Sequence, residues 1–186
     1  ISSYGKRLYF ARIIPYRGAW VEFEFDIHNV LWVRIDKKRK FLATTLLRAT
    51  GLDTDAAILK AFYKTEKLPV GDSLSGRITA SDIIDTSTGE VILEANKTIG
   101  PDEIKIILTS QKIKTVEVIV NNLTVEDTIV PDNTILETLA LDKNRTKQDA
   151  IMDIYKKIRA MEYISPEHAE TFLDNLILKN PKKYDL

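Results

Sequence analysis

The sequence contains no cysteine among its 186 residues, so it forms no disulfide and no cysteine-based zinc site. A chain without cysteine is typical of a reducing compartment, and we expect a cytoplasmic protein. No apolar run approaches the roughly 18 residues of a membrane span, and no cationic-then-apolar signal segment opens the sequence. The chain starts at Ile1 rather than at an initiator Met, which predicts a piece of a longer protein.

Motifs that carry catalysis or bind metals are also missing. The two histidines, His28 and His168, match no HExxH or H-x-E spacing, so no metal site is predicted. The sequence has no P-loop, no GxGxxG and no GxSxG string, and its acidic residues do not cluster as in a two-metal nuclease. We therefore predict no catalytic residue, no metal ligand and no cofactor in this chain.

Charge is balanced in total but divided along the chain. Residues 1–50 hold ten Lys/Arg against four Asp/Glu, whereas residues 69–141 hold five against twelve. The two remaining segments, 51–68 and 142–186, are close to neutral. Such a division predicts a basic surface for a polyanion and an acidic surface for a different partner.

Strands are predicted at residues 7–14, 20–25 and 30–35, with turns at 15–18 and 26–29. Glu22 and Glu24 alternate with apolar residues, so one face of this antiparallel sheet is expected to be solvated. Helices are predicted at residues 42–49, where Gly51 marks the stop, and at 54–63.

After a composition shift at residues 68–71, a turn at 85–89, strands at 90–94 and 115–120 and a helix at 101–108 are predicted. Helices return at residues 148–159 and after Ser165. We predict an α+β fold, in which an antiparallel sheet with helices is built from both chain ends, residues 1–68 and 142–186. A small, acidic, β-rich α+β module, residues 69–141, is inserted between them.

A block of four cations at residues 37–40 follows the third strand, with Asp36 at its head. One interpretation is a solvated loop, because short cation runs are common on surfaces. The other is binding of unpaired nucleic acid, in which cations neutralise phosphates and aromatic rings stack on bases. Residues that favour the second interpretation lie in the same fifty positions: Arg7, Arg12, Arg17, Arg34, Trp20 and Trp32. Each Trp has the alternative of a core position, and Trp20, at a turn–strand junction, fits that alternative less well.

These segments resemble the lobe of the bacterial RNA polymerase β subunit. The similarity lies in residues 11–20 (ARIIPYRGAW), 23–26 (FEFD), 33–40 (VRIDKKRK) and 44–49 (TTLLRA), and resumes in 154–159 (IYKKIR), 169–176 (AETFLDNL) and 183–186. Residues 76–120 resemble the insertion of the external, β–β′-type module that some lineages carry in this lobe. The resemblance covers nearly the whole chain.

The resemblance implies a non-catalytic arm that walls the downstream DNA cleft and contacts the non-template strand. Trp20 matches the family's base-stacking tryptophan and Asp36 the aspartate beside it. Lys37, Arg159 and Lys183 match positions where the family usually has DNA-contacting arginines. Lysine keeps the charge of arginine but loses its planar fork. Lys38, Arg39 and Lys40 are expected to face phosphate.

The resemblance further implies DNA and the other polymerase subunits (the rest of β, β′, α and ω) as partners, together with sigma and other transcription factors. It implies no membrane partner, a place in the cytoplasm at the nucleoid, and a Mg²⁺ site that lies in the parent polymerase outside this chain. Two alternatives stay open. The acidic insert acts as a docking module for a transcription factor or sigma, or the chain is an independent single-strand-binding protein, which would require tight DNA binding by the isolated chain.

Overall fold

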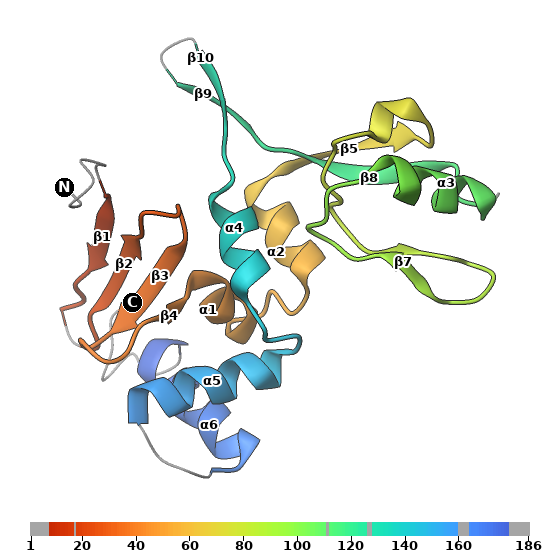
Figure 1. Cartoon of the computed structure of the whole chain (residues 1–186). Coiled ribbons are helices and arrows are strands. Elements are labelled where there is room, and N and C mark those ends of the chain that lie inside the picture. Colours follow the sequence, from red (N-terminus) through yellow and green to blue (C-terminus); the bar gives the residue numbers. More distant parts are fainter. Residues whose placement is uncertain (1–7, 17, 111, 126–127, 160–163, 179–186) are drawn as a thin grey trace. The chain divides into compact units, whose positions relative to one another are not determined.

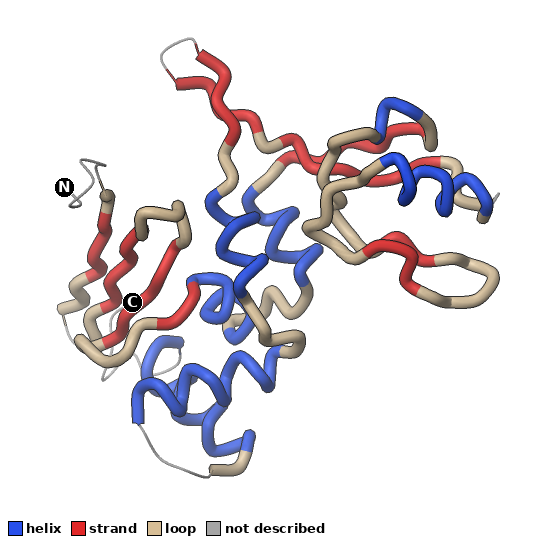
Figure 2. The backbone as a smooth tube through the Cα atoms, in the orientation of Figure 1, coloured by secondary structure: helices blue, strands red, loops and turns tan. Residues whose placement is uncertain are grey.

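The computed structural model describes residues 8–16, 18–110, 112–125, 128–159 and 164–178 (Figure 1). The chain forms two compact units: a first unit of Ile1–Thr54 with Glu137–Leu186, and a second unit of Asp55–Leu136. Figure 2 shows strands and helices in both units. No described helix is long and apolar enough to cross a membrane.

The first unit begins with a four-stranded antiparallel sheet. Its strands are β1 (Phe10–Ile13), β2 (Val21–Phe25), β3 (Leu31–Ile35) and β4 (Phe41–Leu42), in the order β1-β2-β3-β4. Asp26 fixes the turn between β2 and β3, because its Oδ1 accepts the amides of His28 and Val30 at 2.8 and 3.0 Å. Asn29 adopts φ 64° in this turn, a conformation that asparagine tolerates well.

Helices from both ends of the chain cover one face of this sheet. They are α1 (Ala43–Ala49), α5 (Lys147–Arg159) and α6 (Pro166–Leu173), followed by a π-helical turn η2 (Asp174–Leu178). Val33 and Phe41 of the sheet share one buried core with Ile154 of α5 and Leu173 of α6. Alternate strand residues point away from this core and form what we call the outer face: Phe10, Arg12, Glu22, Glu24, Trp32 and Arg34.

A buried polar network also joins the two chain ends of the first unit. The carboxylate of Asp142, only 8% exposed, accepts the hydroxyl protons of Thr44 and Thr45 at 2.7 and 3.3 Å. Its other oxygen accepts from Asn144 Nδ2 at 3.0 Å. Since a buried carboxylate is stable only when it is well hydrogen-bonded, this network ties α1 to the segment that follows α4.

The second unit contains α2 (Asp55–Phe62), β5 (Lys64–Pro69), a 3₁₀ turn η1 (Asp72–Leu74), β6 (Ile83–Ile84), β7 (Val91–Leu93), α3 (Pro101–Thr109) and β8 (Thr115–Val120). β9 (Asn122–Val125) and β10 (Thr128–Pro131) form a hairpin, and α4 (Thr134–Leu141) crosses the boundary between the units. β5 pairs with β8, and β6 pairs with β7. The core of the second unit contains the fully buried side chains of Leu74, Ile99, Ile107 and Val118.

The α+β class is confirmed, as are the three N-terminal strands and the helices around residues 43–49, 55–62, 101–109 and 147–159. β5, β9, β10 and α4 were not predicted. The compact units divide at 54/55 and 136/137, whereas the predicted lobe and insert divide at 68/69 and 141/142. Part of the difference arises because β5 pairs with β8 from Lys64 to Pro69, which places residues 64–68 with the second unit. The division into lobe and insert stays a prediction.

Candidate nucleic-acid interface

A tight turn presents the start of the cation block at the end of β3. The amide of Lys38 donates to the carbonyl of Ile35 at 2.9 Å, and the two central residues, Asp36 and Lys37, have φ 48° and 58°. Positive φ at both central positions defines a type I′ turn, whose twist suits antiparallel strands. Residues other than Gly, Asn and Asp rarely adopt positive φ. Asp36 is therefore suited to its position in the turn, whereas Lys37 adopts a disfavoured backbone conformation.

Asp36 joins this turn to Trp20. The amide of Asp36 donates to the Trp20 carbonyl at 2.9 Å, and the amide of Trp20 donates to Asp36 Oδ1 at 2.9 Å. The pair thus extends the β2–β3 ladder by one position beyond Val21 and Ile35. The carboxylate therefore positions the backbone that carries the indole ring.

Trp20 is 37% exposed, and its ring lies beside two cations. Arg12 Cζ is 5.4 Å and Lys37 Nζ 5.9 Å from the ring centroid, both within the range of cation–π attraction. Gly18, Trp20, Asp36 and Lys37 line a shallow depression of about 330 Å³. A planar group entering this depression meets an aromatic ring, a carboxylate and an ammonium group.

Trp32 has a different environment. Its Nε1 donates to Asp26 Oδ2 at 3.0 Å, and Lys40 Nζ lies 4.8 Å from its ring centroid. Partial burial by itself raises the pKa of Asp26, but the hydrogen bonds from Trp32 and from the amides of Val30 and His28 outweigh it, so the pKa is lowered. Trp32 is therefore fixed to the β2–β3 turn by a charged acceptor.

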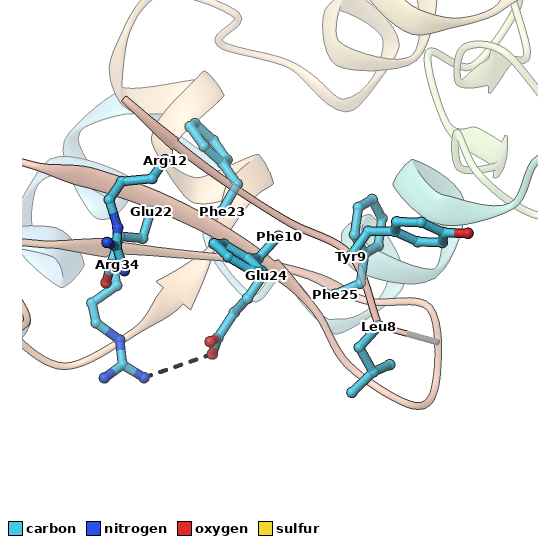
Figure 3. Close-up of a pocket in the computed structure, with 9 residues that line it drawn as sticks. All are labelled: Leu8, Tyr9, Phe10, Arg12, Glu22, Phe23, Glu24, Phe25 and Arg34. Atoms are coloured by element: carbon cyan, nitrogen blue, oxygen red, sulfur yellow. Dashed lines mark ion pairs between the residues drawn. The ribbon is translucent and has the colours of Figure 1, made fainter. Parts of the chain in front are cut away.

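The glutamates of β2 offset two cations of the outer face, Arg12 and Arg34, and the neighbouring Lys40. Arg12 Nη2 lies 2.5 Å from Glu22 Oε1, and Glu24 Oε1 lies 3.7 Å from Arg34 Nη2 and 3.1 Å from Lys40 Nζ. Figure 3 shows the Arg34–Glu24 ion pair at a depression of about 410 Å³ that Tyr9 and Phe10 also line. The positive potential of this face is therefore smaller than the count of its Lys and Arg residues suggests.

The remaining predicted site residues are placed as follows. Arg39 is exposed in the segment between β3 and β4. Arg159 ends α5, with its Cζ 4.9 Å from the ring centroid of Phe172. Lys183, like Arg7 and Arg17, lies outside the described residues. The structure thus brings Trp20, Asp36 and Lys37 together, places Lys40 beside Trp32, and shows no contact of Arg159 with these residues in the described part of the chain.

Two neighbours of Trp20 were not among the predicted site residues. Arg12 was counted as a neighbouring cation, but the cross-strand register that brings it to the indole depends on the pairing of β1 with β2. Gly18, with φ 127°, lines the depression. Arg48 also contributed to the basic count of residues 1–50. It is only 1% exposed, and its Nη1 donates to the Asp53 carbonyl at 2.8 Å, so its charge lies in the interior rather than on the surface.

Among the described residues, no three His, Cys, Asp or Glu side chains gather in a way that would hold a metal ion. The arrangement instead offers an aromatic ring, cations and a fixed carboxylate on one solvated sheet face. These groups suit non-covalent recognition of a base and its phosphate.

Comparison with known proteins agrees with the sequence resemblance. The family model of RNA polymerase Rpb2, domain 2, matches residues 2–113. A DNA-directed RNA polymerase subunit beta from Chlorobium chlorochromatii (strain CaD3) is 40% identical over 189 residues, with 98% of this chain and 14% of that protein covered. The subunit beta from Leptospira biflexa serovar Patoc (strain Patoc 1 / ATCC 23582 / Paris) is 38% identical over 184 residues, covering 95% of this chain and 14% of that protein.

A third relative, the subunit beta of Cytophaga hutchinsonii, is 34% identical over 203 residues, covering 98% of this chain and 15% of that protein. The chain therefore spans about one seventh of the length of these curated relatives. Because the family model covers more than half of the chain, the resemblance is confirmed at that level: the chain belongs to the RNA polymerase Rpb2, domain 2, family.

Proposed function

We propose that this chain is the lobe of the β subunit of a bacterial DNA-directed RNA polymerase, with residues 69–141 as its insert. In the assembled enzyme it would wall the downstream DNA cleft and contact the non-template strand, while catalysis and its Mg²⁺ belong to other parts of the polymerase. Its partners would then be DNA, the remaining subunits and sigma, in the cytoplasm at the nucleoid. The family membership and the polymerase relatives support this proposal.

The observation that carries the DNA-contacting role is the exposed indole of Trp20, fixed by Asp36 and flanked by Lys37. Any of the four bases can stack on an indole when it is unpaired, and stacking of this kind contributes about 1–3 kcal/mol per base. Lys37, in the same depression, would neutralise a neighbouring phosphate.

The geometry supports a positioning role for Asp36 more directly than a base-reading role. One carboxylate oxygen already accepts the Trp20 amide at 2.9 Å. We therefore assign Asp36 to holding Trp20 and the type I′ turn, and its second oxygen remains the acceptor for a base edge. Arg39, Lys40, Arg159 and Lys183 would add phosphate attraction, which Glu24 weakens at Lys40.

A comparison of two templates tests this role. Polymerase assembled with Trp20→Ala should bind a template with an unpaired non-template strand on the order of 1–3 kcal/mol more weakly, and bind fully paired duplex unchanged. Trp32→Phe is the control, because its indole is held by Asp26 and should not distinguish the two templates. Equal losses on both templates for Trp20→Ala would reject the stacking role.

A second function, protein docking by the insert, is favoured by its charge. Residues 69–141 hold twelve acidic against five basic residues, which repels DNA and favours a protein partner, sigma or another transcription factor, that presents a complementary basic surface. Deleting residues 70–140 from the polymerase should abolish factor binding and leave the bubble-template affinity intact. Unchanged factor binding would reject this function.

A further inference from the structure

The second unit carries a groove of mixed polar and apolar lining between β7 and α3, two elements whose ribbons are neighbours in Figure 1. Val91 and Ile92 of β7 and Ile106 and Thr109 of α3 line it, and its volume is about 410 Å³. Val91 is 50% and Ile106 55% exposed. Half-exposed apolar side chains on both walls give the apolar groups of a partner a surface to cover.

Both walls of the groove are held in place before any partner arrives. α3 is anchored by Ile104 and Ile107, which are 7% and 0% exposed, so that Ile106 projects outward. Its first turn is closed by Glu103, whose carboxylate accepts the Gly100 amide at 3.0 Å.

The β6–β7 hairpin forms the other wall. The amide of Asp85 donates to the carbonyl of Glu90 at 2.8 Å and so closes the hairpin. The amide of Gly89, a residue with φ 76°, donates to the Asp85 carbonyl at 2.7 Å. The Asp85 carboxylate accepts the Ser87 amide at 2.7 Å, and this hydrogen bond is the largest cause of the lowered pKa of Asp85. Asp85 is therefore a fixed negative charge at the edge of the groove. Because the groove is already formed, little conformational entropy is lost when a partner binds.

The charge around the groove selects the occupant. Asp85 and Glu90 line it together with the apolar residues, and residues 82–110, which include both walls, hold six acidic residues against two basic ones, Lys97 and Lys105. Lys105 is paired with Asp102 on α3. Phosphate groups are repelled by such a surface, whereas Lys and Arg are attracted.

We propose that this groove docks a basic amphipathic segment of a partner protein, with apolar side chains against Val91 and Ile106 and flanking Lys or Arg residues against Asp85 and Glu90. The inference rests on the docking function proposed for the insert and gives that function a location and a partner chemistry.

A designed peptide pair provides the test. One fluorescein-labelled peptide of about 15 residues carries Leu at i, i+3, i+4 and i+7 with Lys elsewhere, and the second replaces each Lys by Glu. Fluorescence anisotropy measures their binding to polymerase core enzyme that contains the full-length β subunit. The Lys peptide should bind, more weakly as salt rises, and the Glu peptide at least about ten-fold more weakly.

Two substitutions on one helix locate the binding. Ile106 lines the groove and Leu108 does not, although their exposed fractions are similar, 55% and 53%. Ile106→Ser should weaken binding of the Lys peptide at least about five-fold, Leu108→Ser less than two-fold, and Glu90→Lys should weaken it as Ile106→Ser does. Because these side chains are exposed, the variants should keep the wild-type unfolding temperature and bubble-template affinity.

Equal effects of Ile106→Ser and Leu108→Ser would overturn the proposal, as would equal binding of the two peptides or no binding of the Lys peptide at millimolar concentration. Failure of the groove is distinguishable from failure of the docking function. If deletion of residues 70–140 abolishes factor binding and Ile106→Ser leaves it intact, the insert docks a factor through a different surface.

Discussion

Replacing Asp36 tests how the turn at the end of β3 holds Trp20. In Asp36→Ala, the Trp20 amide loses its acceptor, a contact worth about 0.5–1.5 kcal/mol. Alanine also tolerates the positive φ of 48° less well than aspartate, which costs about 1 kcal/mol more. We expect Asp36→Ala to lower the free energy of unfolding by about 1.5–2.5 kcal/mol.

Asp36→Asn is the matched variant, because asparagine keeps a side-chain oxygen as acceptor and tolerates positive φ as aspartate does. We expect it to change the free energy of unfolding by less than about 0.5 kcal/mol. Urea unfolding of the 186-residue chain, followed by circular dichroism, measures both values. An unchanged midpoint for Asp36→Ala, or an equal loss for the two variants, would refute the role assigned to this turn.

The same pair separates position from charge in DNA binding. If Asp36 acts by positioning Trp20, polymerase with Asp36→Asn keeps the wild-type affinity for an open-bubble template and Asp36→Ala loses part of it. If both variants lose affinity equally, the negative charge itself contacts the base.

Three further predictions concern pH and salt. The lowered pKa of Asp26 contributes stability that is present above about pH 4 and lost as pH falls through the folded pKa. In thermal unfolding between pH 2 and 6, the unfolding temperature of Asp26→Asn should therefore fall less at low pH than that of the wild type. Burial raises the pKa of Tyr63 to about 12, above its ordinary value of 10.0, so the associated stability is present below pH 10 and is lost, by up to about 2 kcal/mol, as pH rises to 12; Tyr63→Phe should lack this alkaline loss in equilibrium unfolding. The isolated chain, with four to six cations available, should bind single-stranded DNA weakly, with a slope of log affinity against log salt of about −3 to −4 in anisotropy titrations; tight binding that persists at high salt would favour an independent single-strand-binding protein.

The elements that the sequence predicted well are those whose own residues decide their structure. α5 repeats apolar residues at Ile151, Ile154, Tyr155 and Ile158, and three of these four are buried as that spacing requires. β5 was missed because Lys64–Pro69 alternates without a clear apolar face. Its conformation depends on pairing with β8, which is far away in the sequence.

The candidate site could be predicted only in part, because its geometry also depends on contacts between segments that are far apart in the sequence. Trp20, Asp36 and Lys37 are identifiable from the sequence pattern and resemblance, but the link between them is a turn with two positive φ angles and no glycine. The usual signal for such a turn, Asn-Gly or Asp-Gly, is absent. The ion pairs of Glu22 and Glu24 with outer-face cations follow from strand register, which local patterns do not fix.

The central claim is that Trp20 stacks on an unpaired non-template base, and a thermodynamic cycle tests it most directly. Polymerase with Trp20 or with Trp20→Ala binds two bubble templates, one with a normal base at the stacking position and one with an abasic site. We predict that Trp20→Ala weakens binding by about 1–3 kcal/mol when the base is present and by less than about 0.5 kcal/mol when it is absent. An equal loss on both templates would contradict stacking by Trp20.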